Sequence, residues 1–421
     1  MRLGLNSLVL AAGLVLAAGV AAARTLVVNP DTFGAALAAA APGDVLRLAP
    51  GRYRGNFRIA VPLTLEGEAG AVLDGGGHGR VIEVAAADVT IRGLTVSGSG
   101  SSLEAEDSGI FLTPEAVRAV VKGNRLENNL IGVYIKGARD ALVDENVIVG
   151  RRDPHMNARG NGVQLWNAPG AVVRGNDVRY GRDGIFTTTS RDNRFLDNRF
   201  RDLRFAVHYM YTEDSEVAGN RSEGNHVGYA LMYSRRIHVH DNLSRRDRDH
   251  GILLNYVLDS EITRNAVVDG GGKCVFIYNA NINRITDNWF ERCRIGIHFT
   301  AGSERNIVSG NAFVGNRVQV KYVGTRLLDW SHEGRGNYWS DDPNFDLDGD
   351  GIGDRPYRPN GLVDHVLWAH PEAKLLMKSP ALGLLRVAQE RLPLLYPGGV
   401  VDTAPLMRPS RPPILEPEAR S

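Results

Sequence analysis

The chain has few cysteines, almost no net charge and only one long apolar run. Its two cysteines, Cys274 and Cys293, lie too far apart for a CxxC motif and leave two alternatives open, a disulfide or a pair of buried thiols. The formal net charge is +1, so no large field of one sign attracts nucleic acid or an anionic membrane. Glycine is abundant, with 48 residues, which suits a fold with a tight turn in every repeat.

The apolar run lies at the amino end, from Leu8 to Val20, after the positively charged Arg2. Ala21-Ala22-Ala23 follows as a small-residue cleavage site, so residues 1–23 are expected to be a signal peptide. An uncleaved anchor helix is the alternative, but the stretch is short and rich in alanine for a membrane span, which needs about 18 residues or more. The mature chain is therefore expected outside the cytoplasm, in a bacterial periplasm.

An asparagine recurs at intervals of 22 or 23 residues, except for one interval of 30 that contains the stretch 151–159. These positions are Asn124, Asn146, Asn176, Asn198, Asn220, Asn242, Asn265, Asn288 and Asn311. A second marker keeps the same period, at Gly109, Gly132, Gly162, Gly184, Ala206, Gly228, Gly251, Cys274 and Gly296. Such a period is typical of a β-solenoid, in which coils stack at about 4.8 Å and one asparagine per coil forms a ladder. The pattern predicts an all-β fold, a right-handed parallel β-helix.

The ends of the repeat region predict further segments. Residues 24–44 are expected to be an N-terminal cap, with a short helix over 32–41 that covers the apolar end of the first coil. The β-helix is expected over 45–325. An Asp-rich, cation-binding connection is expected over 326–360, and a partly helical tail over 361–421.

Strand alternation after the glycine marker sorts the side chains into two faces. The first and third residues are regularly apolar and are expected to point inward, as in Ile110 and Leu112. The second residues form one outward column, namely Phe111, Tyr134, Gln164, Phe186, His208, Ala230, Leu253, Phe276, His298 and Lys321. The fourth residues form another, namely Thr113, Lys136, Trp166, Thr188, Met210, Met232, Asn255, Tyr278 and Thr300. An exposed apolar strip of this kind usually marks a binding surface, with Trp166, Phe186, Phe276, Tyr278 and His298 as candidate partner contacts.

Soft metal ligands gather in these columns. Met210 and Met232 lie 22 residues apart, hence one above the other, and His208 shares their face. Thioether sulfur selects Cu(I) over hard cations, so the three residues are a candidate site for transiently bound copper. The alternative is that the methionines are filler on an adhesive surface. His155 and Met156 are further candidates, because the irregular interval should loop them outward.

A second candidate metal site lies in the segment DLDGDGIGD, which starts at Asp346. Asp346, Asp348, Asp350 and Asp354 with Gly351 match the first half of a Ca²⁺ loop, whereas position 12 is Tyr357 and no helix–loop–helix is expected. An Asp/Gly-rich surface turn is the alternative. The four carboxylates would repel one another without a cation, so a structural Ca²⁺ or Mg²⁺ is expected here.

The chain resembles the NosD family over nearly its whole mature length. The resemblance rests on stretches such as RGNGVQLWN (159–167), RFAVHYMYT (204–212), HVGYALMYS (226–234), GNYWSDDPNFDLDGDGIGDRPY (336–357), SPALGLLR (379–386) and PGGVVD (397–402). It implies a β-helix with carbohydrate-binding and sugar-hydrolase-like (CASH) repeats. It also implies a periplasmic accessory protein that docks on an ABC transporter and helps supply copper to nitrous oxide reductase. A copper chaperone lipoprotein and the reductase itself would be exchange partners.

The resemblance does not carry the copper ligands over residue by residue. It does suggest that the tail, with Leu375, Leu376, Leu384, Leu385 and Val387, forms a helix that docks on the transporter; the alternative is a cap over the last coil.

An extracellular uronan lyase or epimerase is the main rival function, since Asp153-Pro154-His155 faintly resembles a motif of alginate epimerases. Such an enzyme needs a groove with an acid/base pair and basic residues. The two outward columns contain no carboxylate, and their only lysines are Lys136 and Lys321. A surface adhesin is a second rival, but it leaves the histidines and methionines unexplained. We therefore expect a protein that is not an enzyme and has no catalytic residues.

Overall fold

The recurrent asparagines form a continuous buried ladder that joins each coil to the next. The Oδ1 atom of Asn198 accepts hydrogen bonds from the backbone nitrogen and the Nδ2 of Asn176, at 3.0 and 2.9 Å. The Nδ2 of Asn198 also donates to the Val173 carbonyl at 2.9 Å. The computed structural model describes residues 23–153, 155–324, 326–364 and 398–416, with the single residues 372, 379, 380, 384 and 388.

The residue before each ladder asparagine turns the chain. Its φ is positive in coil after coil, at 65° in Gly175, 54° in Asp197 and 67° in Gly219. Glycine adopts this left-handed conformation at no steric cost, and aspartate tolerates it better than most residues. This requirement explains the repeated Gly-Asn and Asp-Asn pairs of the sequence.

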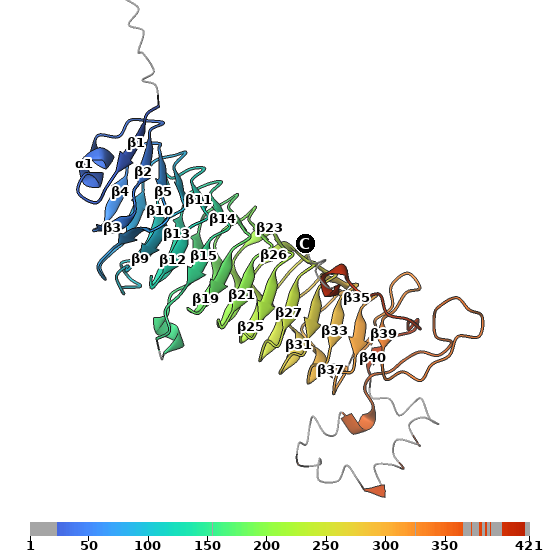
Figure 1. Cartoon of the computed structure of the whole chain (residues 1–421). Coiled ribbons are helices and arrows are strands. Elements are labelled where there is room, and N and C mark those ends of the chain that lie inside the picture. Colours follow the sequence, from blue (N-terminus) through green and yellow to red (C-terminus); the bar gives the residue numbers. More distant parts are fainter. Residues whose placement is uncertain are drawn as a thin grey trace, which may run out of the picture.

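Each coil gives one strand to each of three parallel sheets, which run along the whole stack (Figure 1). Sheet A contains β1 (Thr25–Val28), β2 (Val45–Leu48), β5 (Thr64–Gly67), β8 (Thr90–Arg92), β11 (Val120–Lys122), β14 (Leu142–Asp144), β17 (Val172–Arg174), β20 (Arg194–Leu196), β23 (Glu213–Ala218), β26 (Arg235–His240), β29 (Glu261–Thr263), β32 (Arg284–Thr286) and β35 (Ile307–Ser309). Sheet B contains β3 (Gly51–Arg54), β6 (Ala71–Asp74), β9 (Thr95–Ser97), β12 (Arg125–Glu127), β15 (Val147–Val149), β18 (Asp177–Arg179), β21 (Arg199–Arg201), β24 (Arg221–Glu223), β27 (Leu243–Arg245), β30 (Ala266–Val268), β33 (Trp289–Glu291), β36 (Ala312–Val314) and β39 (Tyr338–Trp339). Sheet C contains β4 (Phe57–Ile59), β7 (Ile82–Val84), β10 (Ser108–Leu112), β13 (Ile131–Lys136), β16 (Val163–Trp166), β19 (Asp183–Thr188), β22 (Phe205–Met210), β25 (Val227–Met232), β28 (His250–Asn255), β31 (Lys273–Tyr278), β34 (Ile295–Thr300) and β37 (Val320–Val323).

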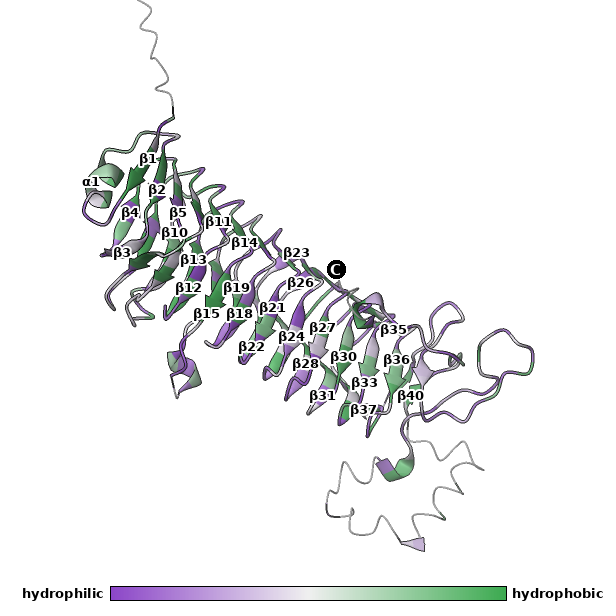
Figure 2. Cartoon of the chain, in the orientation of Figure 1, coloured by the Kyte–Doolittle hydropathy of each residue, from purple (hydrophilic) through white to green (hydrophobic). Residues whose placement is uncertain are grey.

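The expected right-handed parallel β-helix is confirmed, with about 14 turns. Hydrophobic and hydrophilic residues alternate along its strands (Figure 2), and the inward residues, such as Ile110 and Leu112, are fully buried. The glycine marker lies where coils approach most closely, since a Cβ added to Gly132 would lie 2.5 Å from the Gly162 carbonyl oxygen. Cys274 occupies the same position in a later coil.

The two cysteines form a disulfide, which decides between the alternatives that the sequence left open. Cys274 of β31 is bonded to Cys293, which lies just before β34 in the next coil. Both residues are buried. The bond therefore ties one coil to its neighbour from inside the stack.

The amino end of the stack begins earlier than the expected boundary at residue 45. β1 already pairs with β2 in parallel, from Thr25 opposite Val45. Helix α1 (Phe33–Ala38) lies between these strands in sequence and at the end of the stack in space (Figure 1). Its Phe33 is buried and packs against Tyr53 and Phe57, with ring centroids 5.4 and 4.8 Å apart.

The carboxyl end of the stack extends beyond residue 325. Although the period lapses, Asn337 continues the ladder by accepting a hydrogen bond from the backbone nitrogen of Asn311 at 3.1 Å. The Asp402 carboxylate ends the ladder, because it accepts from the Asn337 nitrogen at 2.7 Å and from Trp339 Nε1 at 2.8 Å. Burial raises the pKa of Asp402 to about 6. β38 (Leu327–Asp329) pairs with β40 (Gly399–Val401) beside this cap.

Part of the tail, from Gly399 to Asp402, thus covers the last coil. Two short helical turns with described bounds are η1 (Met156–Ala158) and η4 (Pro413–Leu415). The proposed docking helix falls largely outside the described residues, as does the signal peptide. Within the part that the structure describes, no helix is both long and apolar enough to cross a membrane.

Replacing one ladder asparagine should destabilise the whole stack. Asn198→Ala leaves the Asn176 backbone N–H and the Val173 carbonyl without partners in a dry interior. Each buried group left unsatisfied costs about 1–3 kcal/mol. We expect a correspondingly lower free energy of unfolding in urea, whereas Asn157→Ala, at an exposed position of the loop before β16, should match the wild type. Equal stabilities for the two variants would contradict a structural role of the ladder.

Candidate functional site

The register of sheet C confirms the two outward columns. Met210 of β22 pairs with Met232 of β25, and His208 lies on the same strand two residues before Met210. Both methionines are half-buried and are the last residues of their strands. The spacing between neighbouring strands, about 4.8 Å, lets both thioethers reach one ion.

His208 is more enclosed than an exposed strip predicts, with only 6% of its surface accessible. Its Nδ1 lies 3.0 Å from Oδ2 of the buried Asp183, whose two oxygens also accept hydrogen bonds from Arg204 at 2.8 and 2.6 Å. Burial raises the pKa of Asp183, but hydrogen bonds from His208 and Arg204 outweigh it, so the pKa lies below the usual value. The rings of Phe186 and Phe205 flank the imidazole at 5.0 and 4.8 Å.

This arrangement fixes the tautomer of His208. An ionised carboxylate can only accept, so Nδ1 carries a proton, and in the neutral ring Nε2 then keeps its lone pair. The Nε2 atom is buried and has no hydrogen-bond partner. Histidines that bind a metal usually donate their other ring N–H to a carboxylate, a backbone carbonyl or water. The environment of His208 therefore matches that of a metal-binding histidine.

The outward columns are not exposed along their whole length, which corrects the expectation of a continuous strip. Phe111 and Tyr134 are only 3% and 4% exposed, because Arg80 lies over Phe111 and neighbouring apolar residues cover both rings. Of the candidate partner contacts, Trp166 and Tyr278 are exposed, whereas Phe186, Phe276 and His298 are half-buried.

His298 is held neutral. Burial, followed by the nearby charges of Lys273 and Lys321, lowers its pKa to about 4. Its ring stacks on Phe276 with centroids 4.8 Å apart, and Nδ1 is buried without a hydrogen-bond partner. The imidazole therefore presents an aromatic surface near neutral pH and carries no positive charge there.

Sequence reasoning missed an adjacent row of tyrosines, which we call the tyrosine ridge: Tyr211, Tyr233 and Tyr256. All three follow the ends of sheet C strands and are exposed. Their rings stack at centroid distances of 5.2 and 5.0 Å. The intervals of 22 and 23 residues could have revealed the ridge, but it lies at a turn, one residue beyond the columns considered.

His155 and Met156 lie in the loop that leaves the stack between β15 and β16 (Figure 1), and His155 is exposed. The loop enters sheet C at the amino ends of its strands, whereas Met210 and Met232 lie at the carboxyl ends. Arg159 also directs its guanidinium toward the Met156 sulfur, at 3.9 Å. The five candidate copper ligands therefore do not form a single coordination sphere.

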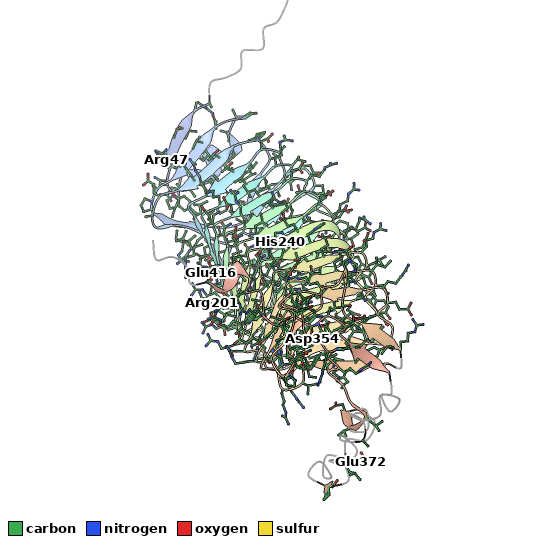
Figure 3. The ribbon with its side chains drawn as sticks, turned by 90° about the vertical axis from the view of Figure 1, so that its right-hand side faces the viewer. Arg47, Arg201, His240, Asp354, Glu372 and Glu416 are labelled. Atoms are coloured by element: carbon green, nitrogen blue, oxygen red, sulfur yellow. A yellow bond between two sulfur atoms is a disulfide. The ribbon has the colours of Figure 1, made fainter. Side chains whose placement is uncertain are left out.

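Sheet A carries a groove of about 850 Å³ on its outer face, which the sequence analysis did not identify. His238 and His240 point outward here, as their position around the buried Val239 predicts. His240 lies about midway along the molecule in Figure 3. Unlike the sheet C columns, this face does contain carboxylates, including Asp214, Glu216 and Glu261.

The Asp-rich segment forms a compact loop near the carboxyl end of the stack, where Figure 3 labels Asp354. Carboxylate oxygens of Asp346, Asp348 and Asp350 lie within 4.8 Å of one another. Asp354 is not part of this cluster, because its Oδ2 accepts a hydrogen bond from the Leu347 nitrogen at 3.0 Å. Three converging carboxylates fit a hard cation such as Ca²⁺.

Comparison with known proteins points to one family. A family model described as periplasmic copper-binding protein (NosD) matches residues 144–344. Proteins named "Probable ABC transporter binding protein NosD" from Stutzerimonas stutzeri and Pseudomonas aeruginosa are each 43% identical to the chain. The matches cover 86% of the chain and 86% and 87% of these relatives.

Solved structures share the fold. The A-module of the mannuronan C-5 epimerase AlgE6 from Azotobacter vinelandii matches 70% of the chain and 96% of its own length, with 15% identity and a TM-score of 0.53. The Streptococcus pneumoniae adhesin PfbA matches 70% of the chain and 87% of its own length, with 13% identity and a TM-score of 0.54. At such identities these likenesses concern the fold alone.

Proposed function

The chain belongs to the NosD family, and from that premise we propose that it works with an ABC transporter to supply copper to nitrous oxide reductase while the copper centres of that enzyme are assembled. The family is periplasmic and copper-binding by description, and the two relatives above are named probable ABC transporter binding proteins. The observation that carries the proposal for this chain is the in-register pair Met210 and Met232 beside His208. Copper is cargo here and is held only transiently.

The ligand set favours Cu(I). Two thioethers and one imidazole contain no thiolate, so they would hold a soft ion in an oxidising compartment and still release it. Asp183 and Arg204 act as positioning residues, since they hold His208 with Nε2 free. His155 and Met156 would form a separate contact point for copper at the other end of the sheet C strands.

The proposed partner surface combines the candidate contacts with the tyrosine ridge. Trp166, Tyr278 and the ridge expose aromatic rings on one side of the stack, next to Met210 and Met232. Aromatic residues are enriched in the cores of protein interfaces. We propose that a copper chaperone lipoprotein and the reductase exchange copper across this surface. The tail is proposed to keep the protein at the membrane through the transporter.

The alternative of a uronan lyase or epimerase is less well supported. Such catalysis needs a group that gives or takes a proton near neutral pH. In the sheet A groove, Arg236 donates a hydrogen bond to Asp214 and Arg194 to Glu216, and these bonds lower the pKa of both carboxyl groups. Ionised, paired carboxylates are weak bases and poor acids. We propose binding without catalysis, because the named relatives are called binding proteins.

Removing the two thioethers should weaken Cu(I) binding. Met210→Leu with Met232→Leu keeps the bulk and polarity of the surface while it deletes both sulfurs. We expect at least a roughly tenfold higher Kd, about 1.4 kcal/mol, in a competition titration with a Cu(I) chelator. Met407→Leu, in a half-buried methionine of the C-terminal cap, is the matched control and should bind as the wild type does. Unchanged affinity in the double variant would remove this site.

Loss of the protein should leave nitrous oxide reductase short of copper. Host cells without the gene should produce reductase with a lower copper content, measured on the purified enzyme by mass spectrometry of the metal. The wild-type gene should restore the content, and the Met210→Leu/Met232→Leu gene should restore less of it. Fully metallated reductase in the deletion strain would contradict the proposed function.

Calcium should stabilise the C-terminal loop through the three converging carboxylates. A bound ion at a free concentration of 100 times its Kd adds about 2.7 kcal/mol of stability. We expect the thermal midpoint of chelator-treated protein to rise when Ca²⁺ is added, and this rise to disappear in Asp348→Asn/Asp350→Asn. Asp31→Asn, at an exposed aspartate near α1, should keep the rise. A Ca²⁺ response that survives in the double variant would place the ion elsewhere.

A further inference from the structure

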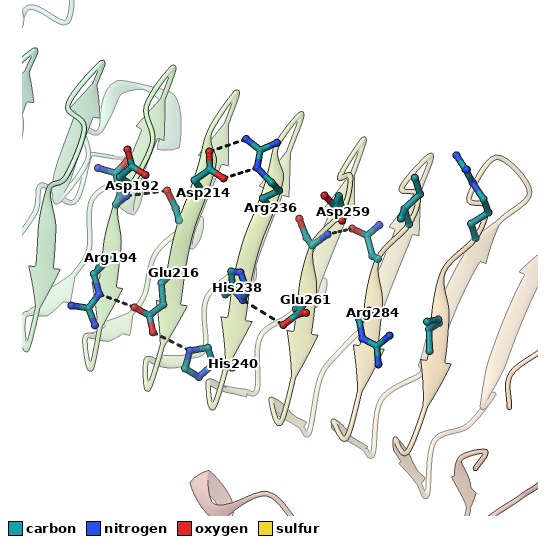
Figure 4. Close-up of a pocket in the computed structure, with 17 residues that line it drawn as sticks. Asp192, Arg194, Asp214, Glu216, Arg236, His238, His240, Asp259, Glu261 and Arg284 are labelled. Atoms are coloured by element: carbon teal, nitrogen blue, oxygen red, sulfur yellow. Dashed lines mark hydrogen bonds and ion pairs between the residues drawn. The ribbon is translucent and has the colours of Figure 1, made fainter. Parts of the chain in front are cut away.

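Charged side chains on the outer face of sheet A neutralise one another, whereas two lysines of sheet C do not. In the groove of sheet A, arginines lie beside carboxylates, and Arg194 contacts Glu216 at 2.7 Å (Figure 4). Lys273 of β31 and Lys321 of β37 lie on the outer face of sheet C, near the carboxyl end of the stack. Neither lysine has an ion pair with any residue that the structure describes. Two positive charges therefore lack a counter-charge on this part of the surface.

The other two lysines of the described chain are both paired. Lys122 contacts Asp144 at 2.9 Å, and Lys136 contacts Glu106 at 2.5 Å. The two lysines without a pair are thus distinct from the rest, and they lie on neighbouring coils of one sheet.

The two unpaired lysines lie around a pair of stacked rings. The Lys273 ammonium is 3.9 Å from the ring centroid of Phe276, and the His298 ring stacks on Phe276 with centroids 4.8 Å apart. The strand register places His298 between Phe276 and Lys321. The His250 ring lies against Phe276 as well, at 5.4 Å. We call these four basic residues, together with Phe276, the basic cluster.

The basic groups of the cluster repel one another. Burial lowers the pKa of Lys273, and the charge of Lys321 lowers it further. Burial, followed by the charge of Lys273, likewise lowers the pKa of His250. The exposed Asp249 carboxylate acts in the opposite direction on both groups but does not offset these shifts. A bound anion would favour the charged form of each lysine and relieve the repulsion.

Aromatic rings connect the basic cluster to the tyrosine ridge. Phe276 lies 6.3 Å from the exposed ring of Tyr278, and Tyr278 lies 5.9 Å from Tyr256, the last residue of the ridge. Protein interfaces are rich in aromatic residues, and their charges are arranged to complement those of the partner. The basic cluster therefore extends the proposed partner surface toward the carboxyl end of the stack and gives it a positive charge.

We propose that the basic cluster binds the carboxylates of an acidic segment of a partner protein that docks on sheet C. Lys273 and Lys321 supply the positive charges, and the exposed ring of Tyr278 adds apolar contact beside them. Both lysines are half-buried, so they attract a carboxylate more strongly than fully exposed ammonium groups do. The inference rests on the proposed partner surface, to which it assigns a partner chemistry, but it does not depend on copper binding.

The test measures how tightly the full chain binds a fluorescent hexaglutamate peptide, by fluorescence anisotropy at low ionic strength. Lys273→Gln/Lys321→Gln should raise the Kd at least about fivefold, because both positive charges are lost. Lys122→Gln makes the same substitution on sheet A, where Asp144 keeps its contact with Arg174, and should leave the Kd unchanged. Added salt should weaken the binding of hexaglutamate, and a hexaglutamine peptide should not bind.

Further measurements distinguish this inference from the copper proposal. Lys273→Gln/Lys321→Gln should keep the Cu(I) affinity of the wild type, and its thermal midpoint should be equal or higher because a repulsion is removed. Met210→Leu/Met232→Leu should lose Cu(I) affinity and still bind hexaglutamate. Each proposal can therefore fail while the other holds.

Three results would overturn the inference. The first is a wild-type Kd for hexaglutamate in the double lysine variant, and the second is an equal loss of binding in Lys122→Gln. The third comes from titration with inorganic phosphate. Phosphate binding that depends on Lys273 and Lys321, without binding of hexaglutamate, would show a site for a small anion and not for an acidic protein segment.

Discussion

The hydrogen bond from one ladder asparagine to the next is the interaction on which the rest of the structure depends. A single coil buries too little apolar surface to be stable, so each coil needs its neighbours. The ladder satisfies turn N–H groups and carbonyls that no water reaches, and it does so only in one register. Because a slip by one residue would turn the apolar side chains outward, ladder and core fix the same alignment. Every vertical pair on the surface, Met210 with Met232 included, follows from that alignment.

The regular backbone presents different chemistry on different sides. Sheet C has thioethers and aromatic rings, the turn that follows it has the tyrosine ridge, and sheet A has paired charges around His238 and His240. Sheet A offers hard, charged groups, whereas sheet C offers soft sulfur beside apolar surface. The outward side chains do not pack in the core. They can therefore differ from coil to coil and from sheet to sheet while the interior stays the same.

The period and the alternation were enough to predict the fold and the columns of sheet C, because both depend on local backbone geometry that repeats. Exposure was not predictable in the same way. The burial of His208 depends on Asp183 of the preceding coil and on Arg204, which lies just before the strand of His208, and that of Phe111 depends on Arg80. Asn337 was not recognised in the sequence because it follows Asn311 by 26 residues and not by 22 or 23. The ladder hydrogen bond between the two forms all the same. The groove escaped because arginine and glutamate on a strand resemble an ordinary solvated face.

The cap at Asp402 has a consequence for the order in which the protein is made. The Asp402 carboxylate accepts hydrogen bonds from the Asn337 backbone nitrogen and the Trp339 indole. It lies 65 residues after Asn337 and 63 residues after Trp339. Coils near the amino end find their partners as soon as the next coil has been synthesised. The last coil must wait, with its apolar end open, until the chain has been synthesised as far as Asp402. Truncation shortly before residue 402 would therefore leave a stack that is complete in its coils and still unsealed, with an edge free to pair with another chain.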